Sequence, residues 1–179
     1  MAARRIATRR VYDGRVLSLD VDDVEEPGGV RAVREVVRHS GSVATLAVHE
    51  DGRVVLVRQY RYPVEQPVWE LPAGRRDPSE SPEAGARREL EEETGLRAER
   101  VEPLFTFFTT PGFCDETMHL FRATGLHQGE ARPEADERIE VRAVPLDEAR
   151  AMIGRGEIRE GKTLVALLLE LEQRRAPGA

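Results

Sequence analysis

The chain has 179 residues, of which 40% are hydrophobic and 34% charged, and its formal net charge is −6. This length fits one domain with a small extension, the negative balance argues against a nucleic-acid partner, and the longest apolar run, residues 164–169, is too short to span a membrane. Cys114 is the single cysteine, so no intrachain disulfide can form, which suits a reducing, cytoplasmic location.

Residues 1–41 predict a small antiparallel β unit. The basic start, residues 1–10, lacks the apolar segment of an export signal, and we expect a solvated tail there. Residues 10–24 alternate apolar and polar, and residues 33–39 form the returning strand after the turn at 27–29. The residues expected to face inward are Val16, Leu17, Leu19, Val21 and Val24. So thin a unit is marginal in water, and it should pack on something.

Residues 42–175 predict a second domain. Two β-branched runs, 42–50 and 53–61, flank Asp51-Gly52, a pair that favours a hairpin. A helix over 82–94 has Ser81 as its N-cap and ends at Gly95. The other expected elements are a strand and turn at 69–74, strands near 101–109, 117–123 and 139–145, a helix from Asp147, and a helix at 162–174 that buries Leu164, Leu167, Leu168 and Leu171. Strands and helices do not alternate strictly, so the expected class is α+β with a mixed sheet between helices.

The helix over 82–94 carries an unusual cluster of carboxylates. Glu89, Glu92 and Glu93 share one face, because residues three and four apart on a helix are neighbours. A solvated acidic face is the simplest interpretation. However, this face borders apolar residues, and the preceding LPAG loop would place backbone carbonyls beside the helix. Clustered carboxylates with carbonyls suit a hard divalent ion, Mg²⁺ or Mn²⁺, which in proteins usually acts on phosphates.

The spacing around this helix resembles the signature of the Nudix hydrolases, G-x5-E-x7-R-E-U-x-E-E-x-G-U, where U is aliphatic. Gly74, Glu80, the run from Arg88 to Glu93, Gly95 and Leu96 fill every fixed position. The resemblance implies an α/β/α sandwich around a mixed sheet, and Mg²⁺- or Mn²⁺-dependent cleavage of a nucleoside diphosphate linked to another group. It also implies that Glu89 and Glu93 are the main metal ligands, with Glu92 close by, that the Ala73 carbonyl is a further ligand, and that Arg88 orients the glutamates by salt bridges.

The flanks resemble the ADP-ribose pyrophosphatase subgroup of this family. Pro111 follows Leu96 by 15 residues, and the segments TTPGFCDE, RQYR and WELPAG are similar to that subgroup. The N-terminal unit, 1–41, resembles the part through which those enzymes form homodimers. The resemblance therefore implies a dimeric hydrolase that converts ADP-ribose to AMP and ribose 5-phosphate.

The same resemblance suggests substrate contacts and a base. Arg58 is a candidate for the diphosphate or terminal ribose, and Pro111 and Gly112 of the proline loop are candidates for substrate binding. Glu116, just after that loop, is a candidate for the metal or ribose. Arg34 and Glu35 are candidates for adenine across the dimer. The attacking water would be positioned by Glu137, with Glu134, Asp136 and Glu140 as competitors for that role.

Two other functions fit the same sequence. One is hydrolysis of another nucleoside diphosphate sugar, such as GDP-mannose, because such enzymes share the signature. The other is a non-catalytic Nudix domain that senses a nucleotide, although the presence of Glu89, Glu92 and Glu93 argues against it. We expect Glu93→Gln, as a substitution at an exposed position, to lower turnover by orders of magnitude without unfolding the protein.

Overall fold

The computed structural model describes residues 2–132 and 138–175. Within them the chain forms two compact units. The first contains Met1–Gly41 and Phe107–Thr117, and the second contains Ser42–Thr106 and Met118–Ala179. The boundary at residue 41 is where the sequence divides the chain. Residues 107–117, which the sequence assigned to the second domain, belong instead to the first unit.

The first unit is built on a three-stranded antiparallel sheet with the order β1-β2-β3. Its strands are β1 (Arg4–Asp13), β2 (Leu17–Glu25) and β3 (Arg31–His39). Residues 4–13 are exposed along their whole length, as expected for a solvated segment, but the expectation of a frayed tail is wrong, because they pair with β2. Between β2 and β3, Gly28 and Gly29 have positive φ, which the turn requires.

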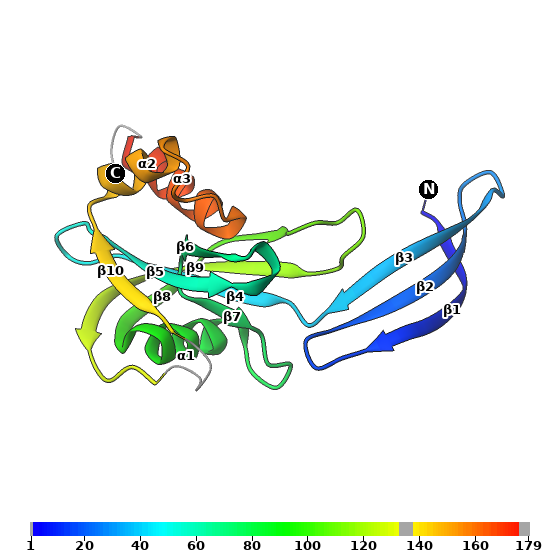
Figure 1. Cartoon of the computed structure of the whole chain (residues 1–179), viewed down its shortest axis with the longest axis horizontal. Helices are drawn as coiled ribbons and strands as arrows, with labels where there is room; N and C mark the ends of the chain where they lie inside the picture. The colour runs from blue at the N-terminus through cyan, green and yellow to red at the C-terminus, as the bar shows by residue number, and fades with distance from the viewer. Residues whose placement is uncertain (1, 133–137, 176–179) are drawn as a thin grey trace. The chain divides into compact units, whose positions relative to one another are not determined.

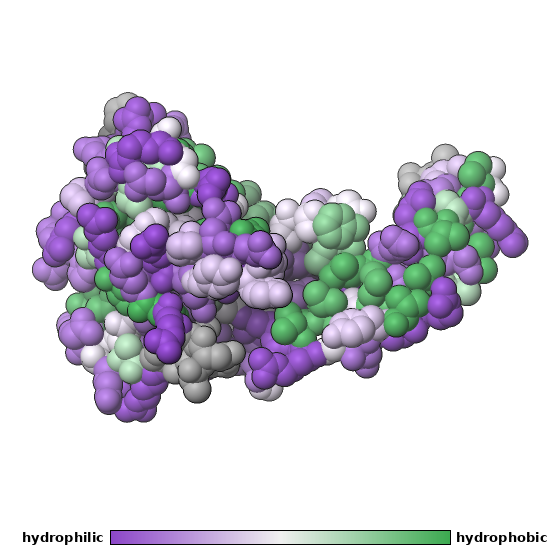
Figure 2. All heavy atoms as spheres, in the orientation of Figure 1, coloured by the Kyte–Doolittle hydropathy of each residue, from purple (hydrophilic) through white to green (hydrophobic). Residues whose placement is uncertain are grey.

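The buried face of β2 is not the one that most of its apolar residues predicted, although Val24 is buried as expected. Ser18, Asp20 and Asp22 are buried, whereas Val16 and Leu17 are exposed. Arginine side chains cover the two aspartates: Arg38 donates to Asp20 at 3.0 Å and to Asp22 at 2.8 Å. Paired charges are the condition under which carboxylates can be buried. Figure 2 shows hydrophobic residues, in green, over the visible face of this sheet.

The described part of the second unit contains two sheets and three α-helices. One sheet has the order β10-β5-β6 and the other has the order β7-β4-β9-β8, in which β4 and β9 are parallel. The strands are β4 (Ser42–Ala47), β5 (Val54–Arg61), β6 (Gln66–Glu70), β7 (Ala73–Arg75), β8 (Leu96–Phe108), β9 (Thr117–Gln128) and β10 (Glu140–Val144). The helices are α1 (Pro82–Thr94), α2 (Leu146–Gly154) and α3 (Gly161–Arg175), with a short 3₁₀ helix, η1, at Tyr62–Val64.

The turn at Asp51-Gly52 forms, but the two strands beside it do not build the expected hairpin. Only Val48 and Val54 make a bridge. Beyond it, β4 pairs with β7 and β9, while β5 pairs with β6 and β10. The two strands diverge because each finds its partners in a different sheet. This divergence places β4 in one sheet beside β7, and β5 in the other beside β6.

Helices cover the strands of the second unit on both sides, with α1 on one side and α2 and α3 on the other (Figure 1). Val43 and Ala47 of β4 pack with Ala86 and Leu90 of α1 in one buried cluster. On α3 the buried residues are Lys162, Thr163, Ala166, Leu167 and Glu170. Leu168, expected in the core, is instead exposed. None of the described helices is both long and apolar enough to cross a membrane.

Candidate functional site

Helix α1 has fixed ends, which set the register of its carboxylates. The Ser81 hydroxyl accepts a hydrogen bond from the Ala84 N–H at 3.1 Å, and Gly95 closes the helix with a φ of 72°. Left-handed backbone of this kind favours glycine. Ala86 and Leu90 are buried against the sheet. With both ends and the buried side fixed, Glu89, Glu92 and Glu93 are held along the edge of the buried face.

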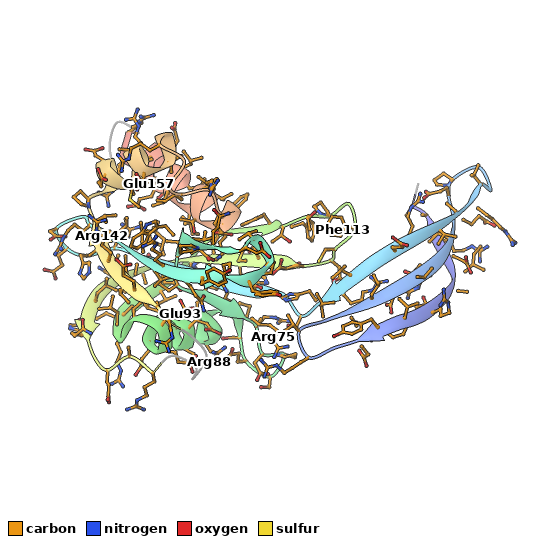
Figure 3. All side chains as sticks on the ribbon, in the orientation of Figure 1. Arg75, Arg88, Glu93, Phe113, Arg142 and Glu157 are labelled. Carbon is orange, nitrogen blue, oxygen red and sulfur yellow. The ribbon has the colours of Figure 1, made fainter. Side chains whose placement is uncertain are left out.

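Arg88 connects three of the signature glutamates. Its guanidinium donates to Glu80 at 2.7 Å, to Glu89 at 2.7 Å and to Glu92 at 2.8 Å. Hydrogen bonding to Glu80 is the largest cause of a raised pKa of Arg88, and the same bond holds the pKa of Glu80 below its ordinary value. Figure 3 labels Arg88 and Glu93, which both lie on α1. These contacts are salt bridges of the kind that the resemblance implied for Arg88.

The beginning of β7 contacts α1 through two carboxylates. The Ala73 N–H donates to Glu93 at 3.1 Å. The carboxyl group of Glu89 fills the space where a Cβ on residue 74 would lie, so position 74 accommodates only glycine without displacing Glu89. Glu93 is 4% exposed, so the expectation that it is exposed is wrong. The Glu92 side chain is 42% exposed, so it is more accessible to solvent than Glu89 and Glu93.

The donor set of this region fits a hard divalent ion. The carboxylates of Glu89 and Glu93 and the backbone of Ala73 offer oxygen ligands, which Mg²⁺ and Mn²⁺ prefer. Among the described residues, no three His, Cys, Asp or Glu side chains lie close enough together to hold a metal by themselves. Mg²⁺ is usually held by one or two carboxylates and keeps several waters or substrate phosphate oxygens. The residues present are consistent with that partial set.

Arg58 and Arg61 lie on opposite faces of β5 and have different partners. Arg58 lies 5.8 Å from the centroid of the Trp69 ring and 3.6 Å from Glu140. For Arg61, hydrogen bonding to Glu70 raises the pKa, and the nearby charge of Glu93 adds to the rise. Arg61 was missed from the sequence. The period of two along a strand was the available signal, because it separates positions 58 and 61 onto different faces.

Most of the proposed substrate contacts meet within the first unit. Arg34, Glu35, Pro111 and Gly112 all line one cavity of about 410 Å³, together with Val36, Phe108, Phe113, Cys114 and Asp115. Glu116 is not among its lining residues, and its carboxylate instead accepts from the Thr109 hydroxyl at 2.9 Å. Glu137, the candidate base, lies outside the described residues, as do Glu134 and Asp136. The remaining competitor, Glu140, faces Arg58.

The model of the NUDIX domain matches residues 38–167. The chain belongs to this family. A methanol dehydrogenase activator from Bacillus methanolicus is 43% identical over 173 residues, which cover 95% of this chain and 94% of the relative. An ADP-ribose pyrophosphatase from Bacillus subtilis is 41% identical over 166 residues, covering 92% and 90%. A solved structure described as an ADP compounds hydrolase superposes with a TM-score of 0.87 at 24% identity, covering 99% of this chain and 97% of the other, and it supports the fold.

The NUDIX match includes some of the candidate site residues and leaves others out. It includes the signature from Gly74 to Leu96, Arg58 and the segment 107–117, but it begins after most of β3. Arg34 and Glu35 therefore lie outside the NUDIX match, although they share a cavity with Pro111, which lies inside it. The relatives cover nearly the whole chain, so they extend to these residues as well.

Proposed function

We propose that this protein is a divalent-metal-dependent hydrolase that converts ADP-ribose and water to AMP and ribose 5-phosphate. The observation that carries the proposal is the contact of Glu89 and Glu93 with Gly74 and Ala73, which brings two signature carboxylates to the backbone at the start of β7. The identity to an ADP-ribose pyrophosphatase over almost the full chain supports ADP-ribose as the substrate. In the net reaction, water oxygen bonds to one phosphorus and the bridging P–O bond breaks.

Mg²⁺ or Mn²⁺ is the proposed cofactor, held by Glu89, Glu93 and the Ala73 carbonyl, with Glu92 beside them. A bound ion of this kind neutralises phosphate oxygens and lowers the pKa of a bound water. Arg88 keeps Glu80, Glu89 and Glu92 oriented through its three salt bridges. It is thereby occupied by carboxylates, and we assign it a positioning role.

The cavity of the first unit is the proposed place of the adenine, which Arg34 and Glu35 would contact across the proposed dimer. Arg34 and Glu35 offer polar side chains to this cavity, and Pro111 and Gly112 also line it. Arg58 and Glu116 remain candidates for the diphosphate and ribose. Alanine at Arg34 should raise KM while leaving kcat nearly unchanged, and an unchanged KM would remove Arg34 from the assignment.

We propose Glu137 as the residue that positions or deprotonates the attacking water. Its position in the acidic stretch before β10, where the ADP-ribose subgroup carries a catalytic glutamate, is the basis for this choice. Glu137→Gln should lower kcat and remove the acidic limb of its pH profile. A profile that keeps this limb would transfer the role to Glu140 or to another acidic residue of the stretch.

A homodimer is the proposed assembly. Ile6, Val11 and Val33 of the first unit are 40%, 41% and 59% exposed, an unusual density of exposed apolar residues on so small a sheet. A second copy would bury them. Light scattering after size exclusion should give twice the chain mass, and a monomer at micromolar concentration would contradict the assembly. A cytoplasmic location is proposed on the single cysteine, which implies no need for an oxidising compartment.

The experiment that tests the function is turnover of a panel of substrates with Mg²⁺ and then with EDTA. ADP-ribose, GDP-mannose, UDP-glucose, a diadenosine polyphosphate and a nucleoside triphosphate form the panel, and products are separated by chromatography. AMP and ribose 5-phosphate, formed fastest from ADP-ribose and abolished by EDTA, support the proposal. A faster reaction with GDP-mannose would move the substrate assignment to that sugar. No turnover on any compound would favour a nucleotide-sensing domain.

A further inference from the structure

A buried charge cluster lies directly before the LPAG segment, and the proposed mechanism does not use it. Glu70, the last residue of β6, is 2% exposed. Arg61 donates to its two carboxylate oxygens at 2.7 and 3.0 Å, in the two-bond geometry that fits a carboxylate to a guanidinium. Lys162, the single lysine of the sequence, donates to the same carboxylate at 2.6 Å from the first turn of α3.

A second set of contacts ties the same turn of α3 to the next residue of the segment. The Thr163 hydroxyl accepts from the Leu71 N–H at 2.9 Å and donates to Glu160 at 2.8 Å. Glu160 also lies 3.2 Å from the Lys162 ammonium. Two consecutive residues of the LPAG approach, Glu70 and Leu71, are therefore held by α3.

The held segment leads straight into the candidate site. Two residues after Leu71, the Ala73 N–H donates to Glu93. Pro72, between them, accepts at its carbonyl from the Thr45 N–H at 2.9 Å. Each residue from 70 to 73 thus makes a hydrogen bond to a residue outside the segment, so the segment has little freedom to move.

The charges of the cluster depend on one another. Burial by itself would raise the pKa of Glu70, but the hydrogen bond from Arg61 and the charge of Lys162 outweigh it, and the pKa of Glu70 is lowered. Glu70 is therefore ionised, so that both of its carboxylate oxygens can accept hydrogen bonds from Arg61. Removing Lys162 would leave a buried carboxylate with one cationic partner instead of two, and a buried charge that loses a partner favours local rearrangement.

We propose that Glu70 and Lys162 are positioning residues of the candidate site, which fix the place of Ala73, the hydrogen-bond partner of Glu93, without touching substrate or metal. The proposal rests on the proposed function, because it assigns the cluster to the same metal and diphosphate site. Helix α3 is far from the signature in sequence, but it would set the geometry of the metal ligands through the buried carboxylate of Glu70. Small displacements of such ligands have large effects on affinity and rate.

A purely structural cluster would behave differently, and the chain offers a matched control for that possibility. Glu170, also on α3, is likewise 2% exposed. It accepts two bonds from Arg122, at 2.9 and 3.1 Å, and a third from Arg174 at 3.0 Å. Glu70 and Glu170 therefore have the same burial and the same kind of partners, but the partners of Glu170 lie on β9 and α3 and not on the LPAG segment or α1. Glu170→Gln should lower stability and leave the site as it is.

The experiment compares Glu70→Gln, Lys162→Met, Lys162→Arg and Glu170→Gln with the wild-type protein. Thermal unfolding gives Tm, electron paramagnetic resonance titration gives the Kd for Mn²⁺, and kcat and KM are measured on the best substrate of the panel well below every Tm. We expect all but Lys162→Arg to lower Tm. Glu70→Gln and Lys162→Met should also weaken Mn²⁺ binding and lower kcat by about tenfold. Lys162→Arg, which keeps the charge, should recover most of both losses.

The proposal is overturned if Glu70→Gln and Lys162→Met follow Glu170→Gln, with a lower Tm but unchanged Mn²⁺ affinity and kcat. If Glu70→Gln does not fold, the pair Lys162→Met and Lys162→Arg decides the same question. Failure of the proposed function is recognised separately, in the wild-type protein. A protein that binds Mn²⁺ but hydrolyses no panel compound still tests the positioning role through the Kd. A wild-type protein that binds no Mn²⁺ overturns the proposal together with the metal site.

Discussion

Replacing Gly74 with alanine should damage the candidate site while leaving the fold intact. The added Cβ would overlap the carboxyl group of Glu89. The backbone does not oppose the change, because Gly74 is not among the glycines with positive φ. The atoms that must move are the far end of a flexible side chain, and moving that side chain off its rotamer costs about 1 kcal/mol. In a domain of this size, that is a fall in Tm of about 2–4 °C.

The functional effect should be much larger than this change in stability. A displaced Glu89 would leave the Ala73-Gly74 backbone and would no longer hold the metal beside Glu93. Misplacing a reacting or ligating group by about 1 Å can cost about 100-fold in rate. The assays are kcat/KM on ADP-ribose and the Kd for Mn²⁺, with Tm measured in parallel.

Gly154→Ala is the matched control for this substitution. Gly154 ends α2, and a Cβ there would have no heavy atom within 4 Å. Its kinetics and its Mn²⁺ affinity should equal those of the wild-type protein. The reasoning is refuted if Gly74→Ala shows the same wild-type values, because the contact of Glu89 with position 74 would then have no bearing on the site.

Three further predictions follow from the charged groups. Glu93→Gln should lower kcat by at least about 100-fold with a small change in Tm, since the amide oxygen can still accept a hydrogen bond; normal turnover would remove Glu93 from the metal ligands. Arg88 holds the pKa of Glu80 below 4.5, so their pairing stabilises the fold above that pH and the contribution is lost as the pH falls through the lowered pKa. Urea unfolding between about pH 7 and pH 3 should show a smaller acid loss for Glu80→Gln than for the wild-type protein, and equal losses would contradict this sign. Arg38→Met should lower Tm more than Arg97→Met, because Arg38 pairs with two buried aspartates and Arg97 with a half-exposed glutamate; equal shifts would show that the buried pairs carry no net stability.

The NUDIX signature is predictable from sequence because its geometry is local. Ser81 and Gly95 define the ends of α1, and the spacing of three and four residues then places the glutamates on one face. The fold class followed from the mixture of elements. The family resemblance suggested four residues that line the first-unit cavity: Arg34, Glu35, Pro111 and Gly112. Their grouping around one cavity was not visible in the sequence.

Other features depended on partners that are distant in sequence. Apart from Val24, the apolar residues of β2 predicted the wrong buried face, because Arg10 and Arg38 reach across from the neighbouring strands and cover Asp20 and Asp22. Alternation along a strand identifies two faces but does not say which one will be buried when long charged side chains are available to cover a polar face. The basic N-terminus formed a strand for the same reason, since its arginines find these aspartates.

By itself, the sequence determined the helix of the signature, the identity and spacing of its carboxylates and the family. These depend on backbone geometry over one or two helical turns, and such geometry is set by nearby residues. Only the tertiary structure decided that Arg61 and Lys162 both reach the Glu70 carboxylate, and that residues 107–117 join the first unit. Each of these pairs distant segments of the chain, and a buried charge selects its partner from whatever the folded chain brings within hydrogen-bonding distance.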